Sequence, residues 1–186
     1  SNNMFDPAVA GVGVHWIYYS YADNIGCSGI DSASIEVFAL PTANAGADVT
    51  ICEGSCTDLT ATGGVSYAWS TGGQTATINV CPGQQSTFTV TVTDANGCVA
   101  TDDVMVSLFA LPVADAGADQ SICAGDCVNL TATGGASYAW SGGQTGATIN
   151  VCPAQTTTYM VTVTDANGCQ DVDDVTITVD PVPVAN

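Results

Sequence analysis

The chain contains no lysine and no arginine among its 186 residues, and this absence restricts both its partners and its chemistry. With 18 acidic residues and one histidine, the formal net charge is −18. Such a chain repels phosphate backbones and anionic membrane surfaces, so we expect no nucleic-acid partner. Schiff bases and isopeptide bonds that need lysine are excluded, and ion pairs cannot stabilise the fold because the cationic partner is missing.

Long apolar runs and helical periodicity are also missing. No stretch approaches the roughly 18–20 apolar residues that cross a bilayer. The first residues lack the charged segment and apolar run of a signal peptide. We therefore expect neither a membrane span nor a signal peptide in this sequence, and no substantial helix.

An internal repeat organises the chain. An offset of 71 positions superimposes two sets of four cysteines and one tryptophan on each other. The matched residues are Cys52 and Cys123, Cys56 and Cys127, Cys81 and Cys152, Cys98 and Cys169, and Trp69 and Trp140. The register predicts two complete repeats at 41–111 and 112–182. Residues 1–40 are interpreted as the C-terminal part of a preceding repeat, and 183–186 as the start of a further one.

The nine cysteines indicate disulfides and an oxidising compartment. Domains of about 70 residues bury only about 60% of their unfolded surface, so covalent cross-links would supply stability that a small core lacks. The cysteine spacing does not form the paired short loops of a zinc ribbon, and the single histidine, His15, lies outside both four-cysteine sets. We favour disulfides over zinc, and an extracellular or cell-surface location.

Strict alternation of apolar and polar residues predicts β-strands throughout. Residues 87–93 alternate Thr with Phe or Val, and 158–164 repeat the pattern before an Asn-Gly turn. The strands expected in the first complete repeat are 47–52, 56–62, 66–70, 75–80, 86–93 and 98–108. Residues 15–37 predict a similar hairpin, with Ile17, Tyr19 and Tyr21 facing inward.

The predicted fold class is therefore all-β, with tandem immunoglobulin-like β-sandwich domains in a linear array. Trp69 and Trp140 fall in the third strand of each repeat, where such a sandwich buries its core tryptophan. We predict that both tryptophans are core residues rather than ligand-stacking residues.

Several sequence strings carry a family resemblance. They include Ala-Gly-Ala-Asp-x-x-Ile-Cys, Tyr-Ala-Trp-Ser and Thr-Val-Thr-Asp-Ala-Asn-Gly-Cys, together with Phe-Asp-Pro-Ala-Val-Ala-Gly-Val-Gly at 5–13. The chain resembles the immunoglobulin-like and PKD-like repeats of very large Bacteroidota surface proteins, including gliding-type adhesins. The resemblance implies extracellular stalks, adhesins and filaments, and it implies no catalytic residues.

The order of strands in an immunoglobulin-like sandwich constrains the disulfides. The start of the second strand and the end of the strand at 75–80 share one end of the domain, so we predict Cys56–Cys81 and Cys127–Cys152. Cys52 and Cys98 lie at opposite ends, about 20 Å apart at 3.3 Å per residue.

Two alternatives follow for the remaining cysteines. One is a bridge between repeats, Cys52–Cys169, in which Cys98 pairs with an earlier repeat and Cys123 with a later one. The other is Cys52–Cys98 within one domain, which requires a different strand order. Cys27 matches Cys98 in the register and belongs to the same set.

Other candidate sites are weaker. The acidic residues that could donate oxygens to calcium are Asp102, Asp103, Asp165, Asp171, Asp173 and Asp174. The preferred interpretation is an acidic edge that prevents strand pairing with other chains. Calcium is the one cofactor that the sequence suggests. Ser32 and Asn129 lie in short sequences that match O-glycan and N-glycan acceptors.

The leading functional hypothesis is a non-catalytic structural segment of a surface adhesin, a disulfide-stiffened stalk or filament. The alternatives are a carbohydrate- or protein-binding module that uses Trp16 and Tyr18, and accessory domains of a secreted hydrolase. The expected partners are neighbouring repeats of the same chain and, in a filament, other copies. If Ser1 were a mature terminus, the incomplete first repeat would favour strand exchange between copies.

Overall fold

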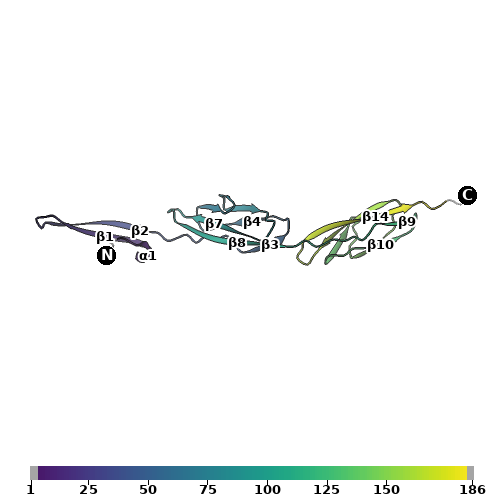
Figure 1. Ribbon diagram of the computed structural model, residues 1–186, viewed down its shortest axis with the longest axis horizontal. Coiled ribbons are helices and arrows are strands. Elements are labelled where there is room, and N and C mark those ends of the chain that lie inside the picture. The colour runs from purple at the N-terminus through teal and green to yellow at the C-terminus, as the bar shows by residue number, and fades with distance from the viewer. Residues whose placement is uncertain (1–3, 184–186) are drawn as a thin grey trace. The chain divides into compact units, whose positions relative to one another are not determined.

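The computed structural model describes residues 4–183 and shows an all-β protein, which confirms the predicted fold class (Figure 1). Of the predicted start of a further repeat at 183–186, residues 184–186 lie outside the described part. In the described part, helix α1 spans only Pro7–Ala10, and no helix is long and apolar enough to cross a membrane. Asp6 caps α1 by accepting a hydrogen bond from the Ala8 backbone N–H at 2.9 Å.

The N-terminal part of the chain is a two-stranded hairpin. Strand β1 spans Gly13–Ala22 and pairs antiparallel with β2, Ser28–Val37. The side chains expected to face inward are not all covered, because Tyr19 and Tyr21 are 54% and 62% exposed. Among the described residues, β1 and β2 form a two-stranded sheet by themselves, without the second sheet that covers the core side chains of each complete repeat.

Each of the two predicted complete repeats contains the same six strands. The strands of 41–111 are β3 (Val49–Cys52), β4 (Thr57–Thr60), β5 (Ser66–Trp69), β6 (Thr77–Val80), β7 (Ser86–Thr93) and β8 (Val99–Phe109). The strands of 112–182 are β9 (Gln120–Cys123), β10 (Val128–Thr131), β11 (Ser137–Trp140), β12 (Thr148–Val151), β13 (Thr157–Thr164) and β14 (Gln170–Asp180). Each limit of the first set lies within two residues of the limit expected from the sequence.

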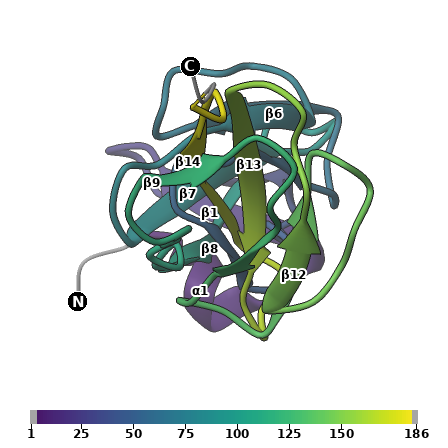
Figure 2. The same cartoon turned by 90° about the vertical axis from the view of Figure 1, so that its right-hand side faces the viewer.

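The strands form one four-stranded and one two-stranded sheet per repeat, as in an immunoglobulin-like sandwich. The four-stranded sheets have the orders β3-β8-β7-β5 and β9-β14-β13-β11, and the two-stranded sheets are β4-β6 and β10-β12. β13 and β14 run antiparallel side by side (Figure 2). The first strand of each repeat pairs parallel with the last, β3 with β8 and β9 with β14.

The first strand of each repeat changes sheets along its length. Before β3, Asn44 forms an isolated antiparallel bridge with Thr62, and Asp115 does the same with Thr133 before β9. A few residues later the chain has moved to the edge of the four-stranded sheet. Backbone groups at this crossing leave the regular ladder and need other hydrogen-bond partners.

The core of the repeat at 112–182 is a cluster of apolar side chains around Trp140, which is 3% exposed. Leu130, Val161, Val175 and Ile177 pack in this cluster and are fully buried. The matching tryptophan of the other repeat, Trp69, is 4% exposed. Both tryptophans are therefore buried, as their place in the third strand of each repeat predicts.

Contacts divide the chain into two compact units. One contains Ser1–Asp48, Asp58–Val80 and Thr87–Met105, and the other contains Val49–Thr57, Cys81–Ser86 and Val106–Asn186. The border between the units passes through β7 and β8 rather than between the predicted repeats. The repeat boundaries at 41 and 112 remain predictions from the sequence register.

Gly63 and its repeat partner Gly134 permit the close approach of two chain segments. Both have positive φ, 104° and 103°. A Cβ atom on Gly63 would overlap the backbone oxygen of Thr42, and one on Gly134 would overlap that of Val113. Only glycine satisfies both the φ angle and the space at these positions.

We predict that Gly63→Ala lowers the free energy of unfolding by about 1–3 kcal/mol, because it adds left-handed strain and a backbone overlap. Gly83→Ala is the matched control, since a Cβ there meets nothing within 4 Å. It should stay within about 0.5 kcal/mol of the unmodified protein. Chemical unfolding measures both, and equal stabilities would contradict the close approach at Gly63.

Candidate functional site

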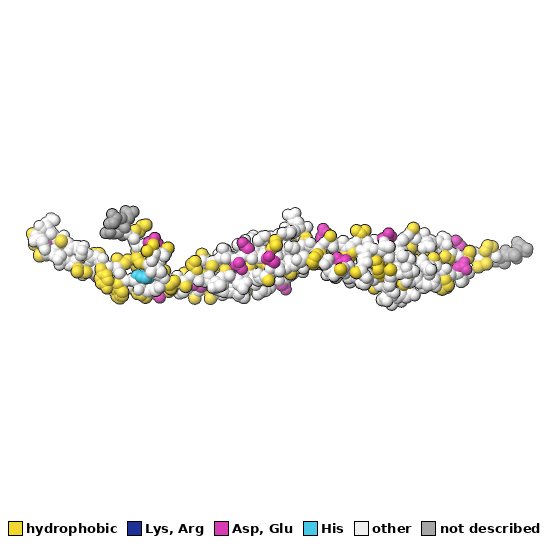
Figure 3. All heavy atoms as spheres, turned by 90° about the horizontal axis from the view of Figure 1, so that it is seen from below, with side chains coloured by type: hydrophobic (Ala, Val, Ile, Leu, Met, Phe, Trp, Pro, Cys, Tyr) yellow, Lys and Arg dark blue, Asp and Glu magenta, His cyan; other side chains and the backbone are white. Residues whose placement is uncertain are grey.

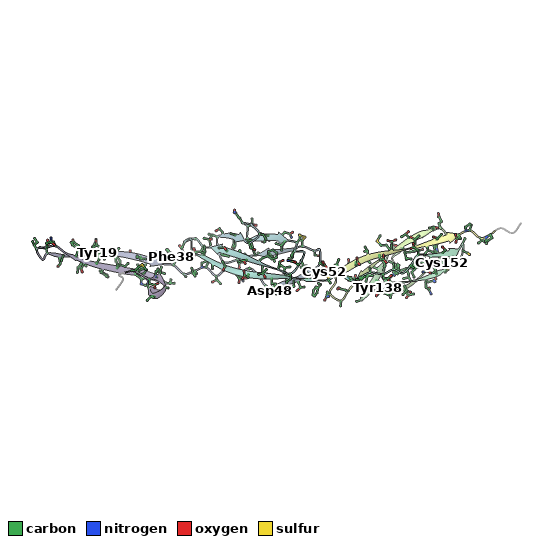
Figure 4. The ribbon with its side chains drawn as sticks, viewed as in Figure 1. Tyr19, Phe38, Asp48, Cys52, Tyr138 and Cys152 are labelled. Atoms are coloured by element: carbon green, nitrogen blue, oxygen red, sulfur yellow. A yellow bond between two sulfur atoms is a disulfide. The ribbon has the colours of Figure 1, made fainter. Side chains whose placement is uncertain are left out.

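Two disulfides close the same loop in both repeats. Cys56 bonds Cys81 and Cys127 bonds Cys152, each at a sequence separation of 25 residues (Figure 4 labels Cys152). Each bond joins the start of the second strand to the end of the fourth, as predicted. A loop of this length removes unfolded-state entropy equivalent to about 3–4 kcal/mol in the chain-entropy model.

A third disulfide joins Cys52 to Cys169 over a sequence separation of 117 residues. Cys52 is the last residue of β3, and Cys169 directly precedes β14. This is the first of the two pairings that the sequence left open. The alternative, Cys52–Cys98, is not formed, and Cys98 is a free thiol.

The backbone around Cys169 is held by Asp165. The Asp165 carboxylate accepts the Cys169 N–H at 2.8 Å, and the Asp165 N–H donates to the Cys169 carbonyl at 2.9 Å. The Asn167 N–H donates to the same carboxylate oxygen at 2.8 Å. Asx turns of this kind fix the backbone of a tight turn. Asp165, a predicted calcium ligand, therefore positions a disulfide cysteine.

The other half of the bond lies in an equally defined segment. The Glu53 N–H donates to the Phe109 carbonyl at 2.9 Å, and the Ser55 N–H donates to the Cys52 carbonyl at 3.0 Å. Cys52, labelled in Figure 4, is thus held beside the last strand of its own repeat. Both sulfur atoms sit on backbone that local hydrogen bonds already define.

Three cysteines of the disulfide set are free thiols in the structure. Cys27 and Cys123 are exposed, and Cys98 is half-buried. Their partners in other repeats remain predictions.

Aspartates supply the hydrogen bonds that are missing where the first strand changes sheets. Asp102 accepts the Ala45 N–H at 2.8 Å, and Asp48 (Figure 4) accepts the Met105 N–H at 2.8 Å. We call the pair Asp48 and Asp102 the aspartate clasp. Because Ala45 is 1% exposed, its N–H would otherwise be buried without a partner.

The second repeat has a matching clasp, Asp119 and Asp173. Asp173 accepts the Ala116 N–H at 2.8 Å, and Asp119 accepts the Thr176 N–H at 2.8 Å. Asp171 adds a bond from the Ala114 N–H at 3.0 Å. The repetition indicates that these carboxylates belong to the fold of the repeat.

These contacts change the interpretation of the predicted calcium ligands. Asp102, Asp165, Asp171 and Asp173 bind backbone N–H groups, which the sequence analysis missed. Asp103 and Asp174 are exposed on β8 and β14. Within residues 4–183 no group of three or more metal-binding side chains is positioned to hold an ion. Calcium remains a prediction from composition.

The two predicted glycosylation sites lie on exposed strand positions. Ser32 is on β2, where its N–H donates to the Asp31 carboxylate at 2.7 Å. That bond, and one from the Tyr19 hydroxyl, hold the pKa of Asp31 below its usual value. Asn129 is on β10 and accepts a bond from the Asn150 side chain at 2.8 Å. Glycosylation at either residue remains a prediction.

Apolar side chains gather on the N-terminal hairpin beside His15, as the yellow surface in Figure 3 shows. Trp16 and Tyr18 are 60% and 68% exposed on β1. His15 Nε2 lies 2.8 Å from the Gly11 carbonyl oxygen, and its ring is near Phe5. The ring nitrogen is thus engaged by backbone, not by a carboxylate or a nucleophile.

No protein-family model and no curated protein matches the chain. Solved structures with similarity include DIP-gamma IG1+IG2, at 11% identity over 76% of this chain and 98% of that one, with a TM-score of 0.34. Another is a Ca2+-stabilized adhesin that helps an Antarctic bacterium reach out and bind ice, at 14% identity, coverage of 90% and 57%, and a TM-score of 0.38.

The Down Syndrome Cell Adhesion Molecule is similar at 14% identity, with coverage of 90% of this chain and 33% of that one and a TM-score of 0.33. All three are adhesion proteins or proteins with immunoglobulin domains.

The aspartate clasp predicts a difference between two neighbouring carboxylates. Asp173→Ala leaves the buried Ala116 N–H unpaired, whereas Asp174→Ala removes the same charge from an exposed position. We expect Asp173→Ala to be less stable than Asp174→Ala by about 1.5–3 kcal/mol, the range for hydrogen bonds to charged groups. Urea unfolding of the two variants measures this difference. Equal stability would show that the clasp contributes nothing.

Proposed function

We propose that the chain is a structural, non-catalytic repeat segment of an extracellular or cell-surface adhesin, serving as a disulfide-stiffened stalk or filament. In this proposal the repeats form a linear array. The observation that carries it is the Cys52–Cys169 bond, which links the first strand of one repeat to the last strand of the next. Three disulfides also favour an oxidising compartment outside the cell.

The bond changes the covalent path that a pulling force follows. Tension that enters along β3 reaches Cys52 and crosses to Cys169, then leaves along β14. The segment between the two cysteines, whose sequence separation is 117, lies outside this path. Its strands stay folded under end-to-end tension, because no load reaches them through the backbone.

The two loaded strands are also braced by their neighbours. β3 pairs parallel with β8, from Val49 opposite Val106 to Cys52 opposite Phe109, and β14 pairs parallel with β9. The load thus runs along strands that have hydrogen-bonded partners, and the smaller sheets are excluded from it. This arrangement suits a stalk that must resist extension.

A role without catalysis fits the chemistry of the polar residues. Four of the six candidate aspartates bind backbone N–H groups, and the clasp occurs in both repeats. His15 interacts with a backbone carbonyl. These residues have structural tasks that account for their positions.

The proposal predicts how far the chain extends when it is pulled by its two termini. Under oxidising conditions the segment between Cys52 and Cys169 should add no length. Cys52→Ser should lengthen the fully extended chain by about 230 Å at about 3.5 Å per residue, because the two 25-residue loops stay closed. Full reduction should add about 400 Å.

Single-molecule force spectroscopy measures these lengths. Cys98→Ser is the matched control, because it removes a free thiol and should leave the extension unchanged. If Cys52→Ser extends no further than the unmodified chain, the disulfide does not redirect force and the stalk proposal fails.

A second candidate function, a binding module, is favoured by the exposed aromatic side chains of the hairpin. Trp16 and Tyr18 are two residues apart on β1, so they share one face of the strand. Aromatic faces of this kind stack on sugar rings or protein surfaces. Trp16→Ala combined with Tyr18→Ala should abolish retention on a polysaccharide array if this function operates, and should leave the extension measurements unchanged.

A further inference from the structure

The Cys52–Cys169 bond reveals two separate covalent paths through the chain. The first runs from Cys27 through β2 to β3 and Cys52, then across the disulfide to Cys169 and β14. The second runs from Cys98 through β8 and the connection to β9, where it ends at Cys123. The three free thiols are therefore the ends of these two paths.

The free thiols lie on the same local backbone structures as the bonded ones. The Cys27 N–H donates to Asp23 at 2.9 Å and the Asp23 N–H to the Cys27 carbonyl at 2.9 Å, as Cys169 does with Asp165. Cys123 matches Cys52, because the Ala124 N–H donates to the Asp180 backbone carbonyl at 2.9 Å and the Asp126 N–H donates to the Cys123 backbone carbonyl at 3.1 Å. Cys27 and Cys123 therefore lie on backbone with the same hydrogen bonds as the cysteines that form the disulfide.

We propose that Cys123 of one copy forms a disulfide with Cys27 of a second copy, joining copies of the chain head to tail. The inference rests on the proposed stalk or filament function and names the partner. The internal register selects this pair. Cys169 lies 117 residues after Cys52. The position 117 residues after Cys123 differs from position 27 by three repeats of 71 residues. In the register, Cys27 of a second copy is therefore to Cys123 what Cys169 is to Cys52.

Exposure selects the same pair. Cys27 and Cys123 are both exposed, whereas Cys98 is half-buried. Because Cys98 is less exposed than Cys27 and Cys123, we expect it to stay a thiol when copies are joined.

The bond needs an oxidant, and a small disulfide such as oxidised glutathione supplies it. The Cys123 thiolate attacks the glutathione disulfide, forms a mixed disulfide and releases one glutathione thiolate. The Cys27 thiolate of the second copy then attacks the Cys123 sulfur and releases the second. Two protein thiols lose two electrons and two protons, and one glutathione disulfide becomes two thiols.

Charge opposes the encounter, because each copy has a net charge of −18. Salt screens this repulsion, with a Debye length of about 8 Å at physiological ionic strength and about 3 Å at 1 M. The rate of joining should therefore rise with salt concentration, up to the highest ionic strength tested.

The test is oxidation of the 186-residue chain with a glutathione redox buffer in high salt, followed by a non-reducing gel. We expect a ladder of multimers whose linking peptides contain Cys123 and Cys27. Cys98→Ser should give the same ladder. Cys27→Ser alone and Cys123→Ser alone should remain monomeric, and a mixture of these two variants should form a dimer and nothing larger.

Retention of the Cys52–Cys169 peptide shows that each variant is folded. A chain that stays monomeric after oxidation would overturn the inference. So would Cys98 in the linking peptides, or a dimer of Cys27→Ser through two Cys123 residues. None of these results affects the length measurements on a single chain, so failure here is distinct from failure of the stalk proposal.

Discussion

The covalent bond between Cys52 and Cys169 is the constraint on which the mechanical account depends. It connects the end of β3 to the turn before β14, and both partners are held by backbone hydrogen bonds of their own repeat. The same turn and strand end recur with free thiols at Cys27, Cys98 and Cys123. The Cys52–Cys169 bond thus accounts for the path of force within the chain, and the cysteines that match it in the register are the positions at which copies can be joined.

The complete lack of lysine and arginine explains how the aspartates are used. With no lysine or arginine to pair with, carboxylates meet backbone N–H groups, and the places that need such an acceptor are the sheet crossings and the cysteine turns. Hydrogen bonds to a charged acceptor contribute more than neutral ones. A chain of net charge −18 therefore places part of its acidity at positions where it stabilises the fold.

The two-residue alternation of apolar and polar side chains and the 71-residue repeat made much of the fold predictable. Alternation at 87–93 and 158–164 located β7 and β13. The Cys56–Cys81 bond was predictable because the order of strands in the sandwich places both cysteines at the same end of the domain. The aspartate contacts were not predictable, because Ala45 and Asp102 are 57 residues apart and meet only through the sheet crossing. The 71-residue repetition of Asp102 as Asp173 was a usable signal for a structural role. Helix α1 was missed, although Asp6-Pro7 is a helix-start signal.

Peptide mapping of the unreduced protein tests the central claim most directly. Trypsin cannot cut a chain without lysine and arginine, so pepsin is the protease to use. Pepsin works in acid, which also suppresses disulfide exchange because thiols are protonated. The account predicts a disulfide-linked pair of peptides that contain Cys52 and Cys169, together with a free thiol on the peptide of Cys98. A linked pair that contains Cys52 and Cys98 would contradict it, since the force path and the joining of copies both require the bond between repeats.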